Sequence, residues 1–160
     1  MTDATKSPEK SDGQMICPLR RDKLVSEFCE VIPSTLDALN SVEERVMDVL
    51  KNLPCAPQEV LSVALSLREA LANAILHGNR NDPTKRVVVA CFCECDKNGG
   101  LLLVVRDEGQ GFDPNEVPDP TGAEAVHEWH GRGIYLMRHF MDEVRYENGG
   151  TEVLLRKRKA

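Results

Sequence analysis

The sequence has few aromatic residues and no long apolar run. Phe, Trp and Tyr together make up 4% of the 160 residues. The longest unbroken apolar run covers only positions 87–93, whereas a membrane-spanning helix needs about 20 apolar residues. The first twenty residues also lack the apolar core of a secretory signal peptide. We therefore expect neither a membrane-spanning segment nor a secreted protein.

An excess of basic residues is missing too. The chain has 20 Lys and Arg against 26 Asp and Glu, which gives a net charge of -6. Proteins that bind nucleic acid directly usually carry a basic surface that neutralises phosphates, so we expect no direct nucleic-acid contact. The six cysteines contain no CxxC pair, and a chain of this length can form a core without disulfides. We expect a reduced, cytoplasmic protein.

The pattern of apolar residues and turn residues predicts an α+β fold in a single domain. Residues 1–20 are polar and are predicted to be a disordered tail, and residues 21–160 form the domain. We expect the helices to cover one face of a mixed, mostly antiparallel sheet, giving a two-layer sandwich. The predicted elements are a strand at 24–32, helices at 35–53 and 57–78, strands at 86–96 and 101–107, a long loop at 108–130, a helix after Gly133, and a hairpin of 143–147 with 151–157.

The second predicted helix carries the first group of candidate functional residues. Glu69, Asn73 and His77 are spaced at i, i+4 and i+8, so they lie on one side of a helix that is otherwise largely apolar. Burying an unpaired amide costs about 1–3 kcal/mol, and a lone carboxylate costs more. The three side chains therefore either line a cleft that holds a polar ligand or form a solvent-facing stripe. We assign His77 to the end of the helix rather than to the site.

Asp107 is the second candidate, because it ends a strand that is apolar without alternation. Such a strand is typical of the centre of a sheet. A carboxylate at its end can accept a hydrogen bond from a ligand amine, and Gly109 and Gly111 would let the backbone approach that ligand. The alternative is an ordinary strand-ending turn, in which Asp and Gly are common.

Gly131 and Gly133 form the third candidate, a Gly-x-Gly motif that leads into the last predicted helix. Free backbone N–H groups and the positive end of the helix dipole can face an anion at such a position. The motif lacks the third glycine of a dinucleotide-binding fingerprint, and the chain contains no GxxxxGK[ST] phosphate-binding loop. Taken alone, this signal is weak.

Cys91, Cys93 and Cys95 fall on one face of the strand predicted at 86–96. Neighbouring Cα atoms on such a face are about 6.6–6.8 Å apart with parallel side chains. This geometry suits neither a disulfide between neighbours nor a tetrahedral zinc site. We predict thiols that are buried like small apolar side chains.

The three candidate sites occur together and in a fixed order. The segments LREALANAILHGN (67–79), DEGQGFDP (107–114), HGRGIYLMRHFMDEV (130–144) and GGTEVLLRK (149–157) resemble the GHKL ATPase superfamily. Within it, residues 23–158 look most like the stand-alone anti-sigma-factor serine/threonine kinases (RsbW-type). The resemblance implies the ATPase fold of the histidine kinases.

The resemblance also implies a role for each candidate residue. Asn73 would ligate Mg²⁺ bound to the phosphates of ATP or ADP, and Glu69 would be the general base. Asp107 would accept a hydrogen bond from the exocyclic amine of adenine, and Thr151 would complete the adenine pocket. The resemblance further implies that Gly109 and Gly111 shape the pocket wall, that Gly131 and Gly133 supply phosphate-binding N–H groups, and that residues 112–130 form a lid over ATP.

The function implied by the resemblance is that of a kinase that also inhibits a partner. Such a protein phosphorylates a small anti-sigma-factor antagonist of the STAS type, binds a sigma factor when the antagonist is phosphorylated, and forms a homodimer. One alternative is a module that binds nucleotide and sequesters a partner without transferring phosphate. A second alternative, the catalytic domain of a two-component histidine kinase, is disfavoured because no phospho-accepting helix pair precedes residue 60.

Overall fold

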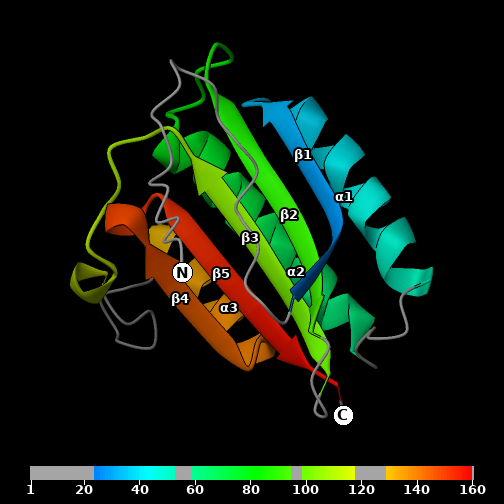
Figure 1. Ribbon diagram of the computed structural model, residues 1–160. Coiled ribbons are helices and arrows are strands. Elements are labelled where there is room, and N and C mark those ends of the chain that lie inside the picture. Colours follow the sequence, from blue (N-terminus) through cyan, green and yellow to red (C-terminus); the bar gives the residue numbers. More distant parts are fainter. Residues whose placement is uncertain (1–23, 53–58, 95–98, 118–128, 160) are drawn as a thin grey trace, which may run out of the picture.

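A five-stranded antiparallel sheet forms one layer of the protein. The computed structural model describes residues 24–52, 59–94, 99–117 and 129–159. In the order β1-β2-β3-β5-β4, every neighbouring pair of strands is antiparallel, and Figure 1 shows their arrangement. The strands are β1 (Leu24–Pro33), β2 (Arg86–Glu94), β3 (Gly100–Asp107), β4 (Glu143–Glu147) and β5 (Glu152–Arg158).

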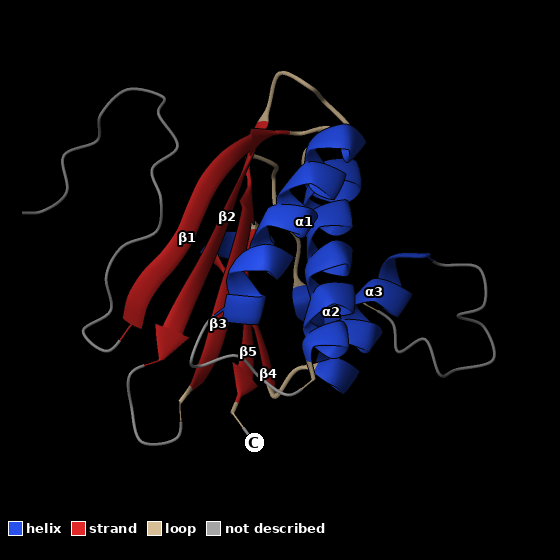
Figure 2. Cartoon of the chain, turned by 90° about the vertical axis from the view of Figure 1, so that its right-hand side faces the viewer, coloured by secondary structure: helices blue, strands red, loops and turns tan. Residues whose placement is uncertain are grey.

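The helices form the second layer and lie on one face of the sheet (Figure 2). This arrangement confirms the predicted α+β sandwich, and the sheet is antiparallel throughout the described strands rather than mixed. The helices are α1 (Leu36–Asn52), α2 (Val60–Ala72) with its π-helical continuation η1 (Asn73–Gly78), and α3 (Trp129–Phe140). In the described connections, η2 (Pro114–Glu116) and η4 (Asn148–Gly150) are short 3-10 turns.

The core lies between the two layers. The apolar side chains at every third or fourth position of α1 point to the sheet, as the sequence pattern predicts. Alternate residues of β2, β3 and β5 meet them, because antiparallel register aligns Cys91 with Leu103 and Leu103 with Leu155. The fully buried core residues include Val42, Val46, Leu50, Leu67, Leu71, Ile75, Val89, Cys91, Leu103, Met137 and Leu155.

The helical segment Val60–Gly78 is long and apolar enough to cross a membrane by length and composition, with a mean hydropathy of 1.3. The same properties are typical of a core helix. Leu67, Leu71 and Ile75 are fully buried against the other elements. Other apolar residues of the same segment, Leu61, Leu65 and Leu76, are exposed.

The second and third helices differ most from the sequence prediction. The second helix begins at Val60, while the predicted start at Pro57 lies outside the described residues. Its last turn widens into a π-helix, which the spacing did not predict. The third helix begins at Trp129 instead of after Gly133, so both glycines of the Gly-x-Gly motif lie within the helix.

The cysteines differ from the expectation of a fully reduced chain. Cys91 is a buried thiol, as predicted. Cys29 and Cys93 are each disulfide-bonded. The expectation is therefore wrong for these two residues, because the absence of CxxC pairs does not limit pairing between cysteines that are distant in sequence.

Candidate functional site

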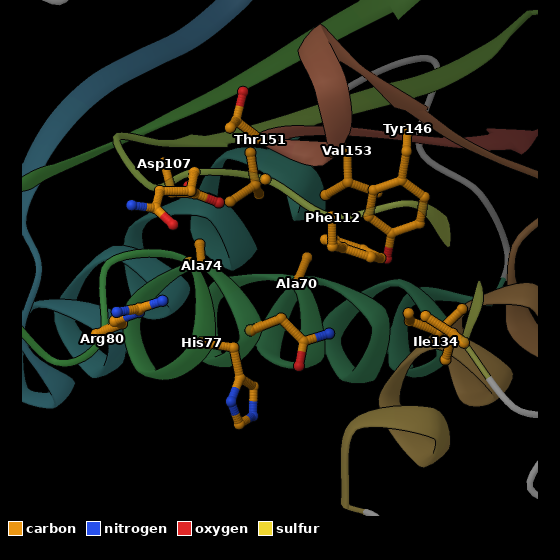
Figure 3. A pocket seen from close by; sticks show the side chains of 17 residues that line it. Ala70, Ala74, His77, Arg80, Asp107, Phe112, Ile134, Tyr146, Thr151 and Val153 are labelled. Carbon is orange, nitrogen blue, oxygen red and sulfur yellow. The ribbon is translucent and has the colours of Figure 1, made fainter. Parts of the chain in front are cut away.

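A cavity of about 360 Å³ lies between the end of the α2–η1 helix and the adjoining end of the sheet. Figure 3 shows Ala70 and Ala74 on the helix side and Thr151, Val153 and Tyr146 on the opposite side. A cavity of this size can hold a small organic ligand. Its lining residues are Ala70, Asn73, Ala74, His77, Gly78, Arg80, Val105, Asp107, Gln110, Gly111, Phe112, Val117, Ile134, Tyr146, Gly150, Thr151 and Val153.

Asp107 and Thr151 form a polar end of this cavity (Figure 3). The backbone N–H of Asp107 donates to the carbonyl of Thr151 at 2.9 Å. The N–H of Gly109 donates to Asp107 Oδ1 at 2.7 Å, which fixes the carboxylate. Burial nevertheless raises the pKa of Asp107 from 3.8 to about 6, although the Gly109 N–H and the charge of Lys85 both act to lower it. A partly desolvated acceptor of this kind favours a ligand that donates a hydrogen bond.

Gly78 and Asn79 hold the Asp107 segment against the end of the helix. A Cβ atom at Gly78 would collide with the carboxylate of Asp107, so glycine allows the close approach. The buried side chain of Asn79 donates to Ser34 Oγ at 3.1 Å and to the carbonyl of Arg86 at 2.9 Å. Its Oδ1 accepts the N–H of Glu108 at 2.8 Å. One amide therefore joins the helix end, β2 and the segment after β3.

Apolar side chains form another part of the cavity wall. The rings of Phe112 and Tyr146 meet edge to face with centroids 5.1 Å apart. Burial raises the pKa of Tyr146 to about 12, so its hydroxyl is neutral at ordinary pH. Val153 lies beside both rings, and Ile134 lines the wall from α3 (Figure 3). A flat ligand with an apolar face and a polar edge fits a cavity with this distribution of groups.

Two glycines bring two loops together at the cavity. Gly111 has φ 75° and Gly150 has φ 91°, conformations that residues with side chains rarely adopt. A Cβ atom on Gly111 would collide with the carbonyl of Gly149, and one on Gly150 with the backbone of Phe112. The N–H of Phe112 donates to the Gly149 carbonyl at 3.0 Å. Both glycines are therefore needed for the close backbone contact that positions Phe112.

Glu69 and Asn73 meet Gly133 where α3 packs against α2. A Cβ atom on Gly133 would lie 2.7 Å from Glu69 Oε2 and 3.3 Å from Asn73 Nδ2. Asn73 also lines the cavity, whereas Glu69 does not. Both side chains are partly exposed. A carboxylate and an amide one turn apart, beside a cavity that opens to solvent, can contact both a bound ligand and an incoming second molecule.

The structure places most of the predicted site residues together. Asn73, Asp107, Gly111 and Thr151 line one cavity, and Glu69 and Gly133 are adjacent to Asn73. Gly109 lies outside the cavity lining and packs against the backbone of Gly78.

The structure describes the backbone of Gly131 but not the burial or contacts of this residue. The two glycines do not precede α3: Gly131 is in its first turn and Gly133 in its second. Because only the first turn of a helix has unbonded N–H groups, Gly133 serves the close packing of two helices rather than an N-terminal anion site.

Sequence reasoning missed several residues of the site. His77 lines the cavity, although we had assigned it to the helix end alone, and its ring points away from Asp107 (Figure 3). Phe112 stands in the quoted segment 107–114, but its contact with Tyr146, which lies in none of the quoted segments, depends on the fold. Gly78 and Asn79 stand in the quoted segment 67–79, so the motif itself contained the signal for them.

The donor set fits a hard cation that arrives with its ligand. No group of three His, Cys, Asp or Glu side chains that could hold a metal occurs in the described ranges. The amide oxygen of Asn73 and the nearby Glu69 carboxylate are oxygen donors of the kind that Mg²⁺ accepts. Mg²⁺ usually keeps several waters and takes its remaining ligands from phosphate, so one amide is a sufficient protein ligand.

Comparison with known proteins agrees with this geometry. Residues 32–157 match the family model of the histidine kinase-like ATPase domain. The anti-sigma F factor of Geobacillus stearothermophilus is 38% identical over 104 residues, which cover 62% of this chain and 69% of that protein. The anti-sigma F factor of Priestia megaterium is 31% identical over 117 residues, 70% of this chain and 78% of that protein. The chain therefore belongs to the histidine kinase-like ATPase domain family, in the group that includes the anti-sigma F factors.

Proposed function

We propose that the protein is an anti-sigma factor that binds Mg-ATP and phosphorylates a serine or threonine of a small antagonist protein. The observation that carries the proposal is the position of Glu69, next to Asn73 and immediately outside the cavity. A nucleotide in the cavity would present its terminal phosphate toward these two residues. The acceptor hydroxyl of a second protein would approach from the solvent side.

The cavity supports a specific orientation of the nucleotide. The Asp107 carboxylate accepts a hydrogen bond from the exocyclic amine of adenine. Thr151 borders the same polar end of the cavity. Phe112 and Tyr146 contact the apolar surface of the base or ribose. The phosphates then extend along η1 toward Asn73 and the first turn of α3, where the N–H of Gly131 is a donor.

The transfer step requires little covalent chemistry from the protein. Glu69 accepts the proton of the acceptor hydroxyl as that oxygen bonds to the γ-phosphorus. The bond from the γ-phosphorus to the bridging oxygen breaks, and ADP leaves. Asn73 would hold Mg²⁺, which would supply positive charge against the phosphates, and the remaining catalysis is positioning.

The names of the relatives support a proposal for the partners. The relatives are named anti-sigma F factors, so we propose that this chain inhibits a sigma factor and is released from it by a STAS-type antagonist. We further propose a homodimer that acts in the cytoplasm, where the transcription machinery is found. Glutathione keeps most thiols of that compartment reduced. We therefore expect Cys29 and Cys93 to be disulfide-bonded only when conditions become oxidising.

Transfer of labelled γ-phosphate from ATP tests the proposal. Wild-type protein added to a lysate of the source organism should label one small protein, and Glu69→Gln should label none while still binding ADP. Glu44→Gln, an exposed change on α1, is the matched control and should label as wild type does. A wild type that binds ADP but labels nothing would refute the kinase and favour the sequestering module.

A further inference from the structure

Arg80 is a cation in the cavity lining that the transfer step does not use. It lies just beyond η1, and it is exposed, so it borders the cavity where the cavity meets solvent. Figure 3 shows Arg80 and Asp107 at one end of the cavity and Ile134 at the other. Because the phosphates extend toward Asn73 and α3 in the proposed orientation, Arg80 lies at the end that holds the base.

The backbone of Arg80 is held in an unusual conformation. Its φ is 54° and that of Asn81 is 57°, in the left-handed region that residues with side chains rarely adopt. Hydrogen bonds on both sides impose this turn. The N–H of Asn79 donates to the carbonyl of Ala74 at 2.8 Å, and the N–H of Asn81 donates to the carbonyl of Ile75 at 2.8 Å. The turn therefore fixes the direction in which the Arg80 side chain leaves the backbone.

The fold itself makes no use of the Arg80 guanidinium. No ion pair or hydrogen bond joins this side chain to any other residue that the structure describes. Arg45 and Arg68, by contrast, each pair with a carboxylate at 2.6 Å. A guanidinium whose planar faces and donors stay available at the rim of a cavity favours a ligand with an electron-rich surface.

The face of a purine base is such a surface. A guanidinium stacks on aromatic rings through its flat shape and its charge. Asp107 is an acceptor for the edge of the base, and Phe112 and Tyr146 are aromatic, so these three residues supply no cation. Stacking also depends little on the hydrogen-bonding pattern of the base. Arg80 would therefore add affinity, whereas Asp107 would select the amine.

We propose that Arg80 binds the base of the nucleotide, with its guanidinium over the face of the ring where the cavity meets solvent. This inference rests on the proposed function, because it needs a nucleotide whose base lies beside Asp107. Arg80 is a binding residue and not a catalytic one. It contributes to the Kd of the nucleotide and leaves the transfer of the γ-phosphate to Glu69 and Asn73.

Calorimetric titration of Arg80→Gly with Mg-ADP tests the contact, and Asn81→Gly is the matched control. Both changes place glycine in left-handed backbone, so both melting temperatures should stay within about 3 °C of wild type. We expect the Kd of Arg80→Gly to rise about fivefold, while Asn81→Gly, which lies outside the cavity lining, binds like wild type. Arg80→Lys keeps the charge without the planar group, and its Kd should lie between the two. Equal Kd values for Arg80→Gly and wild type, or an equal loss in both glycine variants, would overturn the proposal.

Titration with adenosine at millimolar concentration separates a base contact from a phosphate contact. Adenosine has the base and the ribose but no phosphate, so Arg80→Gly should weaken adenosine and Mg-ADP by the same factor. A loss confined to Mg-ADP would place the guanidinium on a phosphate and overturn the base contact. A wild type that binds neither ligand would refute the nucleotide site together with this contact. A wild type that binds both ligands no more tightly than Arg80→Gly does would refute only the role of Arg80.

Discussion

The side-chain oxygen of Asn79 accepts a hydrogen bond from the backbone N–H of Glu108 at 2.8 Å. Asn79 follows the helix that carries Glu69 and Asn73, and Glu108 follows Asp107. The bond therefore fixes the distance between the two sequence motifs that form the cavity. The geometry of the candidate site depends on a residue that does not itself line the cavity.

Replacing Asn79 by alanine should lower both stability and ligand affinity. The side chain is fully buried and makes three hydrogen bonds, and each buried group left unpaired costs about 1–3 kcal/mol. We expect a fall of about 2–4 kcal/mol in the free energy of unfolding measured in urea. Asn115→Ala, an exposed change, should stay within about 0.5 kcal/mol. Equal stabilities of the two variants would show that the Asn79 bonds contribute nothing.

Asp107 should make the protein less stable as pH rises. Its pKa is about 6 in the folded protein against an ordinary 3.8, so the folded state retains this proton more strongly than the unfolded state. The contribution of Asp107 to the free energy of unfolding is fully present below about pH 4. It is lost as the pH rises through about 6 and the folded protein gives up this proton. Asp107→Asn should therefore melt higher than wild type at pH 7.5 and like wild type near pH 4. A lower melting temperature for Asp107→Asn at pH 7.5 would contradict the raised pKa.

Gly133→Ala should impair transfer more than folding. The added Cβ would lie 2.7 Å from Glu69 Oε2, which is the end of a flexible side chain and can move away. Alanine also favours a helix over glycine by about 1 kcal/mol, so the melting temperature should change little. We expect labelled phosphate transfer to fall about tenfold or more because Glu69 is displaced. Transfer at the wild-type rate would show that the contact does not position Glu69.

Phe112→Ala should weaken the binding of ADP. The ring is 41% exposed and meets Tyr146 at 5.1 Å in the cavity wall, and an aromatic contact of this kind contributes about 0.5–1.5 kcal/mol beyond its area. We expect the Kd to rise about tenfold. Tyr135→Ala removes an aromatic ring that is exposed on α3 and outside the cavity, and it should bind ADP like wild type. Equal affinities of the two variants would place the ligand elsewhere.

The sequence predicted the sheet and the main residues of the site because their signals are local. The unbroken apolar run before Asp107 predicted a central strand, and β3 is central and buried on both faces. The spacing of Glu69 and Asn73 predicted one side of a helix. Both signals depend only on the geometry of single elements.

Other features depend on contacts between distant segments and could not be predicted in this way. Glycine disfavours helices, so the sequence predicted that the last helix begins after Gly133. Packing of that glycine against Glu69 outweighs the propensity. The π-helical turn is set by the N–H of Asn79, which donates to the carbonyl of Ala74 five residues earlier at 2.8 Å, while the Asn79 side chain is held by Ser34 and β2.

Calorimetric titration of Mg-ADP tests the central claim, that the cavity beside Asp107 is an adenine-nucleotide site. Wild type should bind one nucleotide per chain, and Asp107→Asn should bind about tenfold or more weakly, because a hydrogen bond to a charged group contributes about 1.5–3 kcal/mol. Because Asp107→Asn is also expected to be the more stable protein at pH 7.5, loss of folding cannot account for that loss of affinity. No heat from wild type at millimolar nucleotide, or equal affinities of the two proteins, would contradict the account.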